Sequence, residues 1–325
     1  MSADRLSYAI HSGGLMLPDG KVALFGASSE GPLPEGDVEV IQTFRPDYDA
    51  LIARGATVLT APEGPYAGAV VTLGRARDLN EARIARAVKI APGGLIVVDG
   101  AKTDGIEPII KALRAKVALL GQVSKAHGKC VWFTADEALL AWDRPAMSAN
   151  KDGDFTAPGV FSADGADPAS VALAQALPPL KGNFADLGAG WGWLSREILR
   201  HEGVKSLHLV EAEKAALDCA EVNVTDPRAS FHWADATRWT PPTKLDGVVM
   251  NPPFHTGRKA EPALGQAFIA TAAKALAPHG QLWMVANRHL PYEQALTTLF
   301  RDVTEIAGSS KFKILHAMRP NRAKR

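Results

Sequence analysis

The sequence predicts an α/β protein made of two tandem copies of one fold, each a mostly parallel β-sheet flanked by helices. Short apolar runs alternate with helical stretches along most of the chain, which is the rhythm of parallel strands joined by helices. There is also an internal repeat, because Ala91-Pro92-Gly93-Gly94 and Ala277-Pro278-His279-Gly280 each precede an apolar run between two helices. Both halves then end with a lysine-flanked strand, Lys129–Phe133 and Lys311–Leu315. Such repetition favours a duplicated architecture.

The composition is that of a soluble globular protein, with 46% hydrophobic and 22% charged residues, and 325 residues leave room for two domains. Thirty-six Lys plus Arg nearly balance 35 Asp plus Glu, so net charge favours no class of partner. Two cysteines, Cys130 and Cys219, make neither a disulfide framework nor a metal cluster and fit a reducing compartment. The segment from Met1 to Leu6 lacks a signal peptide's apolar core, and no run approaches membrane-spanning length. We therefore expect a cytoplasmic monomer that binds neither metal nor membrane.

In the first half, apolar runs predict strands at Val22–Phe25, Val38–Ile41, Thr57–Leu59, Ala69–Leu73, Leu95–Val98 and Cys130–Phe133. Helices are predicted at Pro46–Arg54, Asp78–Ile90 and Gly105–Lys116, with Asp78 as a cap. The first strand runs into Gly26-Ala-Ser-Ser-Glu30, where a nucleotide-binding loop is expected. That loop holds one glycine, and no acidic residue precedes it. The first half is therefore predicted to bind no cofactor.

A domain boundary is predicted near Asn150, because residues 148–170 are rich in Gly, Asp, Pro, Ala and Ser. This gives a first domain of residues 1–150 and a second of residues 151–325. A helix is expected at Val171–Leu177, directly after this connection.

A glycine loop then provides the strongest local signal. Asp186 ends a strand that begins near Phe184, and the loop Gly188-Ala189-Gly190-Trp191-Gly192 opens a helix that continues to Leu199. The glycines permit a tight turn and bring backbone amides close to a ligand at a helix N-terminus. The spacing G-x-G-x-G differs from the G-x-G-x-x-G of dinucleotide sites.

Acidic residues close the next two predicted strands. Leu207–Val210 is followed by Glu211, which is placed to accept hydrogen bonds from the two ribose hydroxyls of a nucleoside. The strand Phe231–Trp233 is followed by Asp235, where an adenine amino group is a suitable partner.

A stiff arm, Asn251-Pro252-Pro253-Phe254, follows the predicted strand Leu245–Met250. The two prolines fix φ and remove two backbone donors, so the segment leaves the strand extended. An amide beside an aromatic face suits a flat, amine-bearing ring. Taken alone, the tetrapeptide fits a simple turn equally well. A fifth strand is predicted at Gln281–Val285.

The loop, the two acidic strand ends and the arm occur in order on consecutive strands, and together they resemble the S-adenosylmethionine-dependent methyltransferases. The equivalent of the arm is absent from the first copy, where the alignment of the halves places Leu73 at the position of Asn251, followed by Gly74 and Arg75. The first copy is therefore predicted to be degenerate and to serve as support, partner contact or substrate contact.

The chain as a whole resembles the ribosomal RNA small-subunit methyltransferase C family, which are guanine-N2 methyltransferases with an inactive first copy and an active second copy. The stretches that carry the resemblance are Pro158–Ser162 with Asp164-Gly165, Asp186–Gly192, Asn251–His255, Val285–Tyr292 and Lys311–Lys313. The family pattern Asp-x-Gly-Ser/Thr reads Asp167-Pro168-Ala169-Ser170 here, so no cofactor contact is assigned to Asp167. The resemblance implies two tandem Rossmann-like methyltransferase folds that act on small-subunit ribosomal RNA.

The resemblance also implies roles for individual residues. The catalytic set is Asn251, Pro252 and Phe254. The residues expected to bind S-adenosylmethionine are Asp186, Gly188, Ala189, Gly190, Gly192, Glu211, Asp235 and Asn251. The residues expected to contact the RNA are Pro253, His255, Arg258 and Lys259, and the tail from Arg319 to Arg325 is either a further phosphate contact or a solvated end.

Three other functions remain open from the sequence. One is guanine-N2 methylation of large-subunit ribosomal RNA, and another is methylation of a protein glutamine, which also presents a planar amine. Phe254 favours a base over glutamine, because glutamine enzymes typically have Tyr at this position. The third is a non-catalytic RNA-binding or ribosome assembly factor, which the complete set of site residues argues against.

Overall fold

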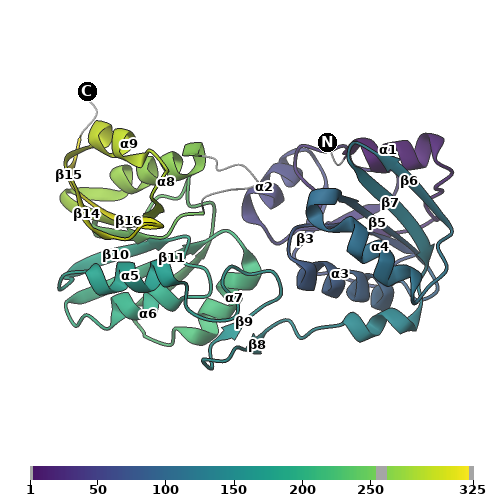
Figure 1. Cartoon of the computed structure of the whole chain (residues 1–325), viewed down its shortest axis with the longest axis horizontal. Helices are drawn as coiled ribbons and strands as arrows, with labels where there is room; N and C mark the ends of the chain where they lie inside the picture. Colours follow the sequence, from purple (N-terminus) through teal and green to yellow (C-terminus); the bar gives the residue numbers. More distant parts are fainter. Residues whose placement is uncertain (1–2, 254–261, 322–325) are drawn as a thin grey trace. The chain divides into compact units, whose positions relative to one another are not determined.

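The computed structural model describes residues 3–253 and 262–321 of the chain. It contains two compact units, unit 1 from Met1 to Ala146 and unit 2 from Met147 to Arg325 (Figure 1). The division falls shortly before Asn150.

Unit 1 is built on a seven-stranded sheet with the order β3-β2-β1-β4-β5-β7-β6. Its strands are β1 (Val22–Phe25), β2 (Val38–Ile41), β3 (Thr57–Leu59), β4 (Gly68–Thr72), β5 (Leu95–Ala101), β6 (Gly121–Lys125) and β7 (Gly128–Thr134). Its α-helices are α1 (Ala3–Ser12), α2 (Arg45–Ala53), α3 (Arg77–Ile90) and α4 (Ile106–Arg114), and 3-10 helices span Lys102–Asp104 and Glu137–Trp142. The first five strands in the sheet order are parallel, and β7 and β6 are antiparallel to their neighbours.

Unit 2 repeats this topology with the order β12-β11-β10-β13-β14-β16-β15. Its main strands are β10 (Gly182–Leu187), β11 (Val204–Glu211), β12 (Ala229–Trp233), β13 (Leu245–Met250), β14 (Leu276–Asn287), β15 (Phe300–Gly308) and β16 (Phe312–Pro320). Its helices are α5 (Pro168–Ala176), α6 (Trp193–Leu199), α7 (Lys214–Asn223), α8 (Pro262–Ala275) and α9 (Tyr292–Leu299). A small antiparallel hairpin, β8 (Ser148–Ala149) with β9 (Phe155–Thr156), precedes α5. The prediction of two tandem, largely parallel α/β folds is confirmed.

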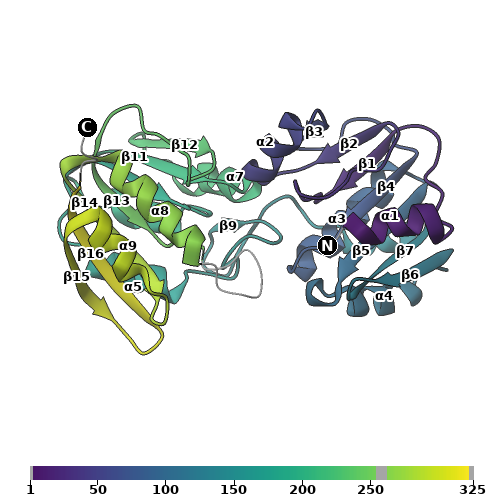
Figure 2. The same ribbon diagram turned by 90° about the horizontal axis from the view of Figure 1, so that it is seen from above.

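Helices cover both faces of each sheet, as Figures 1 and 2 show. In unit 2, α5, α6 and α7 pack on one face through residues such as Leu173, while α8 and α9 pack on the other through residues such as Ile269. In unit 1, α3 and α4 cover one face and α1 and α2 the other. Central strands buried on both sides require apolar side chains at successive positions. This is why β13 is so readily recognised as Leu245–Met250 in the sequence.

In unit 1 one prediction of local structure is wrong, and one edge strand was missed. Asp78 is not a cap, since α3 begins at Arg77 and its N-cap residue is Ala76. The edge strand β6 was not predicted, because Gly121–Lys125 alternates partly buried and exposed residues and contains no apolar run.

Strand register corrects the comparison between the two copies. Gly68 of β4 and Gly247 of β13 each pair with the residue three places before the carboxyl end of the central strand. Counting onward from these two glycines, Thr72 occupies the position of Asn251. The sequence comparison placed Leu73 there, one residue too far, because the register that the hydrogen bonds between strands fix is not visible in a sequence.

A buried ion pair anchors α1 to the sheet of unit 1. Arg5 Nε donates to Asp99 Oδ1 at 2.7 Å, both side chains are 2% exposed, and Arg5 Nη1 also donates to the Ala126 carbonyl. Asp99→Ala leaves the guanidinium buried without its carboxylate, and we expect a loss of about 3 to 5 kcal/mol in the free energy of unfolding of unit 1. Chemical denaturation of the full chain measures it. Asp49→Ala, which removes the exposed pair with Arg45, is the control and costs at most about 0.5 kcal/mol.

Candidate functional site

The candidate site lies where β10 and β13 end side by side in unit 2. The chain order reverses between these two strands, since β11 and β12 extend the sheet from β10 and β14 extends it from β13. Such a reversal leaves a crevice outside the carboxyl ends of the strands. The loop after β10, Glu211 at the end of β11 and Asn251 after β13 therefore meet at one edge of the sheet.

The glycine loop depends on backbone conformations that other residues rarely adopt. Gly188, Gly190 and Gly192 have φ values of 79°, 56° and 91°. The amides of Gly188 and Ala189 both donate to the Val210 carbonyl, at 2.8 and 3.2 Å. These two amides therefore donate within the protein and are not free for a ligand. What the loop provides is a stretch of backbone without side chains, which a ligand can approach closely.

Two carboxylates lie beside the loop. Glu211 is half-buried, and its oxygens accept from the Gly190 and Glu213 amides, each at 2.8 Å. Burial raises the pKa of Glu211, while these hydrogen bonds oppose the rise. Asp235 Oδ1 accepts from the backbone amide and hydroxyl of Thr237, so one of its oxygens is committed to its own turn.

Asp186 is the most deeply buried acid of the site, with 0% exposure. Ser195 Oγ of α6 donates to Asp186 Oδ2 at 2.7 Å, and Oδ1 has no hydrogen-bond partner. A buried oxygen without a partner is costly, so Oδ1 is a candidate for a contact with a polar ligand group.

The arm begins at Asn251, directly after β13. Asn251 Nδ2 donates to Asp167 Oδ2 at 3.0 Å and to Ser170 Oγ at 2.8 Å, two residues at the start of α5. Pro252 is buried and Pro253 is exposed. These two hydrogen bonds therefore hold the Asn251 amide against a helix that begins more than 80 residues earlier in the chain.

Phe254, His255, Arg258 and Lys259 lie outside the described residues. Within the tail, Arg319 pairs through two nitrogens with Asp302, at 2.5 and 2.6 Å, which favours a structural use of this arginine over a phosphate contact.

A narrow cavity of about 50 Å³ joins these parts. It is lined by Phe161, Ser162, Asp167, Ser170, the loop Gly188–Trp191, Trp193, Leu194 and Asn251. Ligand sites are usually several times larger. This cavity therefore has room for only part of a ligand, and Glu211 and Asp235 lie outside its lining.

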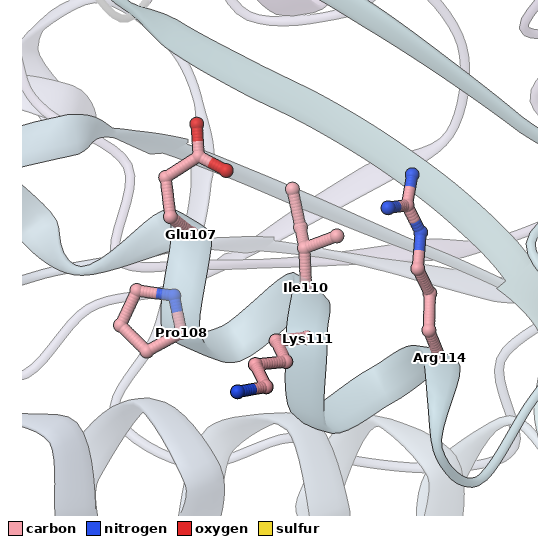
Figure 3. A pocket seen from close by; sticks show the side chains of 5 residues that line it. All are labelled: Glu107, Pro108, Ile110, Lys111 and Arg114. Atoms are coloured by element: carbon pink, nitrogen blue, oxygen red, sulfur yellow. The ribbon is translucent and has the colours of Figure 1, made fainter.

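A larger depression of about 430 Å³ lies along α4 in unit 1. Figure 3 shows that the residues lining it, Glu107, Pro108, Ile110, Lys111 and Arg114, all come from this one helix. Glu107 already pairs with Lys129, and Arg114 bonds Gln122. No converging set of free polar groups exists there among these lining residues, so the depression is a poor candidate for chemistry.

Neither a metal site nor a membrane span occurs in the part of the chain that the structure describes. Among residues 3–253 and 262–321, no three His, Cys, Asp or Glu side chains gather as metal ligands. Over the same residues, every helix is too short or too polar to cross a bilayer.

Comparison with known proteins decides the family. Residues 155–316 match the methyltransferase small domain. Ribosomal RNA small subunit methyltransferase C of Shewanella sp. (strain MR-7) is 30% identical over 69% of this chain and 68% of its own length. The same enzyme of Hahella chejuensis is 30% identical over 74% of this chain and 73% of its own. The chain belongs to the ribosomal RNA small subunit methyltransferase C family.

A solved relative extends the likeness to both units. The 16S rRNA N2 G1207 methyltransferase of T. thermophilus, in complex with AdoMet and guanosine, has a TM-score of 0.76 and 25% identity. The match covers 94% of this chain and 90% of that one. The family resemblance inferred from the sequence is confirmed.

Sequence reasoning missed Asp167 and Ser170 as site residues. The departure from the family pattern led us to assign Asp167 no cofactor contact, yet it lines the cavity and holds Asn251. The available signal was a helix start, since Asp167 caps α5 and Pro168 occupies its first turn. Trp191 is 4% exposed and donates its Nε1 to the Phe161 carbonyl at the cavity.

Asp186 makes stability depend on pH. Burial raises its pKa from 3.8 to about 7, while the Ser195 hydroxyl lowers it and the charge of Glu211 raises it. The protonated acid thus stabilises the fold fully below about pH 4, and this contribution is lost as pH rises through 7. Asp186→Asn resembles the protonated form, so its stability advantage over wild type should grow as pH rises towards 7 and then level off. Thermal unfolding of both proteins between about pH 5 and 8 measures this, and a constant difference contradicts it.

Proposed function

We propose that this chain transfers the methyl group of S-adenosylmethionine to the exocyclic N2 amine of a guanine in 16S ribosomal RNA. The observation that carries the proposal is the placement of Asn251 beside the glycine loop, with both amide hydrogens bound by the protein. An amide held in this way presents its carbonyl oxygen to an amine. The solved relative that binds AdoMet and guanosine supports the choice of cofactor and base.

The residues of unit 2 fit S-adenosylmethionine. The unpartnered Asp186 Oδ1 suits its cationic end, Glu211 its ribose and the free oxygen of Asp235 its adenine amine. Gly188 and Gly190 leave space for it, since a β-carbon at Gly190 would meet no atom within 4 Å. When bound, the cofactor supplies a methyl group that its sulfonium already activates.

The protein's part in the reaction is to hold the amine. The nitrogen lone pair of a guanine amine is delocalised into the ring, so the site must favour a pyramidal nitrogen directed at the methyl group. Asn251 Oδ1 and the Pro252 carbonyl accept its two hydrogens, and Phe254 stacks on the base. No strong base is required, because the proton leaves to solvent after transfer. The base must be unstacked to reach the arm, which favours a loop or a partly assembled subunit.

Unit 2 is the catalytic domain in this proposal, and unit 1 binds no cofactor. Register places Leu24 at the position of Asp186 and Gln42 at that of Glu211. Gln42 is 4% exposed, and its side-chain amide bonds only to backbone groups within the described part of the chain. It donates to the Ala27 carbonyl and accepts from the Thr43 and Phe44 amides.

An arginine also crowds the loop of unit 1. A β-carbon at Gly26 would lie 2.6 Å from Arg83 Nη1, so this guanidinium stands where a cofactor would approach. Unit 1 then serves as support or as a contact for RNA. We further expect the chain to act as a monomer in the cytoplasm, where ribosomal subunits are made.

Methyl transfer to ribosomal subunits tests the function. Small and large ribosomal subunits from cells that lack the protein are each incubated with the purified chain and tritiated S-adenosylmethionine, and the labelled nucleotide or protein residue is mapped. We expect N2-methylguanine in 16S RNA. Label in large-subunit RNA or in protein glutamine would redirect the assignment to those substrates, and absence of label from every acceptor would indicate a non-catalytic assembly factor.

A further inference from the structure

We propose that Asp167 and Ser170 are positioning residues that orient Asn251 for methyl transfer. This inference rests on the proposed function, because it concerns how the same site holds the substrate amine. Neither residue needs to touch the base. They act through the Asn251 side chain, from the start of a helix more than 80 residues earlier in the chain.

The two contacts settle which way the amide faces. Asn251 Nδ2 carries two hydrogens, and it lies 3.0 Å from Asp167 Oδ2 and 2.8 Å from Ser170 Oγ. An ionised carboxylate only accepts hydrogen bonds, so the atom that faces Asp167 must be the nitrogen. Both hydrogens are then used, and Oδ1 is left as the acceptor for the substrate amine. A free Asn side chain would instead populate two orientations, one of which presents a donor to the amine.

The position of Asp167 is itself fixed. Its Oδ2 accepts from the Ser170 backbone amide at 2.9 Å and caps α5, while Pro168 in the first turn restricts the backbone. One carboxylate oxygen therefore starts the helix and holds Asn251. Leu173, which is 0% exposed, anchors the same helix on the sheet. The amide is thus tied to a rigid element before substrate arrives.

The negative charge of Asp167 also favours the transition state of methyl transfer. Hydrogen bonds polarise one another, so donation from Nδ2 to a carboxylate makes Asn251 Oδ1 a stronger acceptor. During transfer, the positive charge moves from sulfur to the amine nitrogen. An acceptor strengthened in this way binds the transition state better than the neutral amine, which raises kcat more than it lowers KM.

Kinetics of four variants test this. We expect Asp167→Ala and Ser170→Ala to lower kcat by about 10- to 100-fold, the effect of losing a hydrogen bond to a charged or fully committed group. The KM for subunits and the affinity for S-adenosylmethionine should change by less than about threefold. Asp167→Asn keeps an oxygen that can cap α5 and accept from Asn251 but lacks the negative charge, so it should recover only the part of the loss that comes from orientation of the amide.

The fourth variant controls for the loss of a helix cap. Asp136 accepts from the Ala138 amide at 2.8 Å and caps the 3-10 helix Glu137–Trp142, which belongs to unit 1 and not to the unit that carries the site. Asp136→Ala should lower thermal stability and leave kcat unchanged.

The outcomes separate this inference from the function on which it rests. If wild type methylates guanine but Asp167→Ala keeps its kcat, or if Asp167→Asn is as impaired as Asp167→Ala while equally stable, the positioning role is wrong and the proposed function stands. If wild type methylates no guanine, both are wrong.

Discussion

Replacing Asn251 with alanine is expected to lower the rate of methyl transfer to 16S ribosomal RNA by about 100- to 1000-fold, the usual cost of removing one acceptor or donor aligned with a transition state. Asn251 Oδ1 is the one side-chain acceptor that the described part of the arm offers to the amine. Its loss also leaves Asp167 Oδ2 and Ser170 Oγ without the amide they hold. Single-turnover transfer of tritiated methyl measures the rate.

The other copy of the fold supplies the control. Thr72 ends β4 at the position equivalent to Asn251, so Thr72→Ala makes a similar truncation at the end of a similar strand. We expect it to leave the transfer rate within about twofold of wild type, because unit 1 carries no chemistry in this proposal. Equal transfer rates for wild type and Asn251→Ala would show that the arm is not part of the active site.

The fold was predictable because its strands are buried on both faces. The apolar runs Val22–Phe25 and Leu245–Met250 coincide with β1 and β13, and the helix after the glycine loop, Trp193–Leu199, coincides with α6. Apolar runs mark such strands even in a single sequence. The edge strand β6 lacks that signal, since one of its faces meets solvent.

The register between neighbouring strands was not predictable. The assignment of Leu73 in place of Thr72 shows why, because hydrogen bonds between β1 and β4 fix the register and leave no trace in the order of residues. The cap of α3 was also mispredicted. Asp78 is a residue type that caps helices well, but α3 already begins at Arg77, and its N-cap residue Ala76 makes no side-chain cap hydrogen bond.

The site was predictable where motif and strand end coincide and hidden where distant segments meet. Asp186, Glu211 and Asn251 each lie at or directly after the carboxyl end of a strand, so the parallel sheet brings them to one edge. The bonds from Asn251 to Asp167 and Ser170 join residues 84 and 81 positions apart. In the sequence, Asp167 and Ser170 indicate only the start of a helix.

Loss of the Glu211 carboxylate is the second large effect we expect. In the proposed function Glu211 supports the cofactor site in two ways, since it binds the ribose and its oxygens also accept from the Gly190 and Glu213 amides. Glu211→Ala therefore removes a ligand contact and releases the loop that shapes the site. Hydrogen bonds to a charged group contribute about 1.5 to 3 kcal/mol, so the affinity for S-adenosylmethionine should fall by about 10- to 100-fold.

Titration calorimetry on the full chain measures this affinity together with the number of sites. We expect one site per chain in wild type. Gly190→Trp should abolish binding, because the space beside Gly190 is open to the site and its φ of 56° suits no bulky side chain.

Gln42→Ala is the matched control for Glu211→Ala, because Gln42 occupies the equivalent strand end in unit 1. It removes three hydrogen bonds to backbone and so lowers the stability of unit 1, but it should leave affinity and stoichiometry as in wild type. A second site in wild type that disappears in Gln42→Ala would show that unit 1 binds the cofactor after all. One site that survives Glu211→Ala with unchanged affinity would instead place the ribose elsewhere in unit 2. Only the combination of one site, sensitive to Glu211 and indifferent to Gln42, is consistent with a single active copy in a duplicated fold.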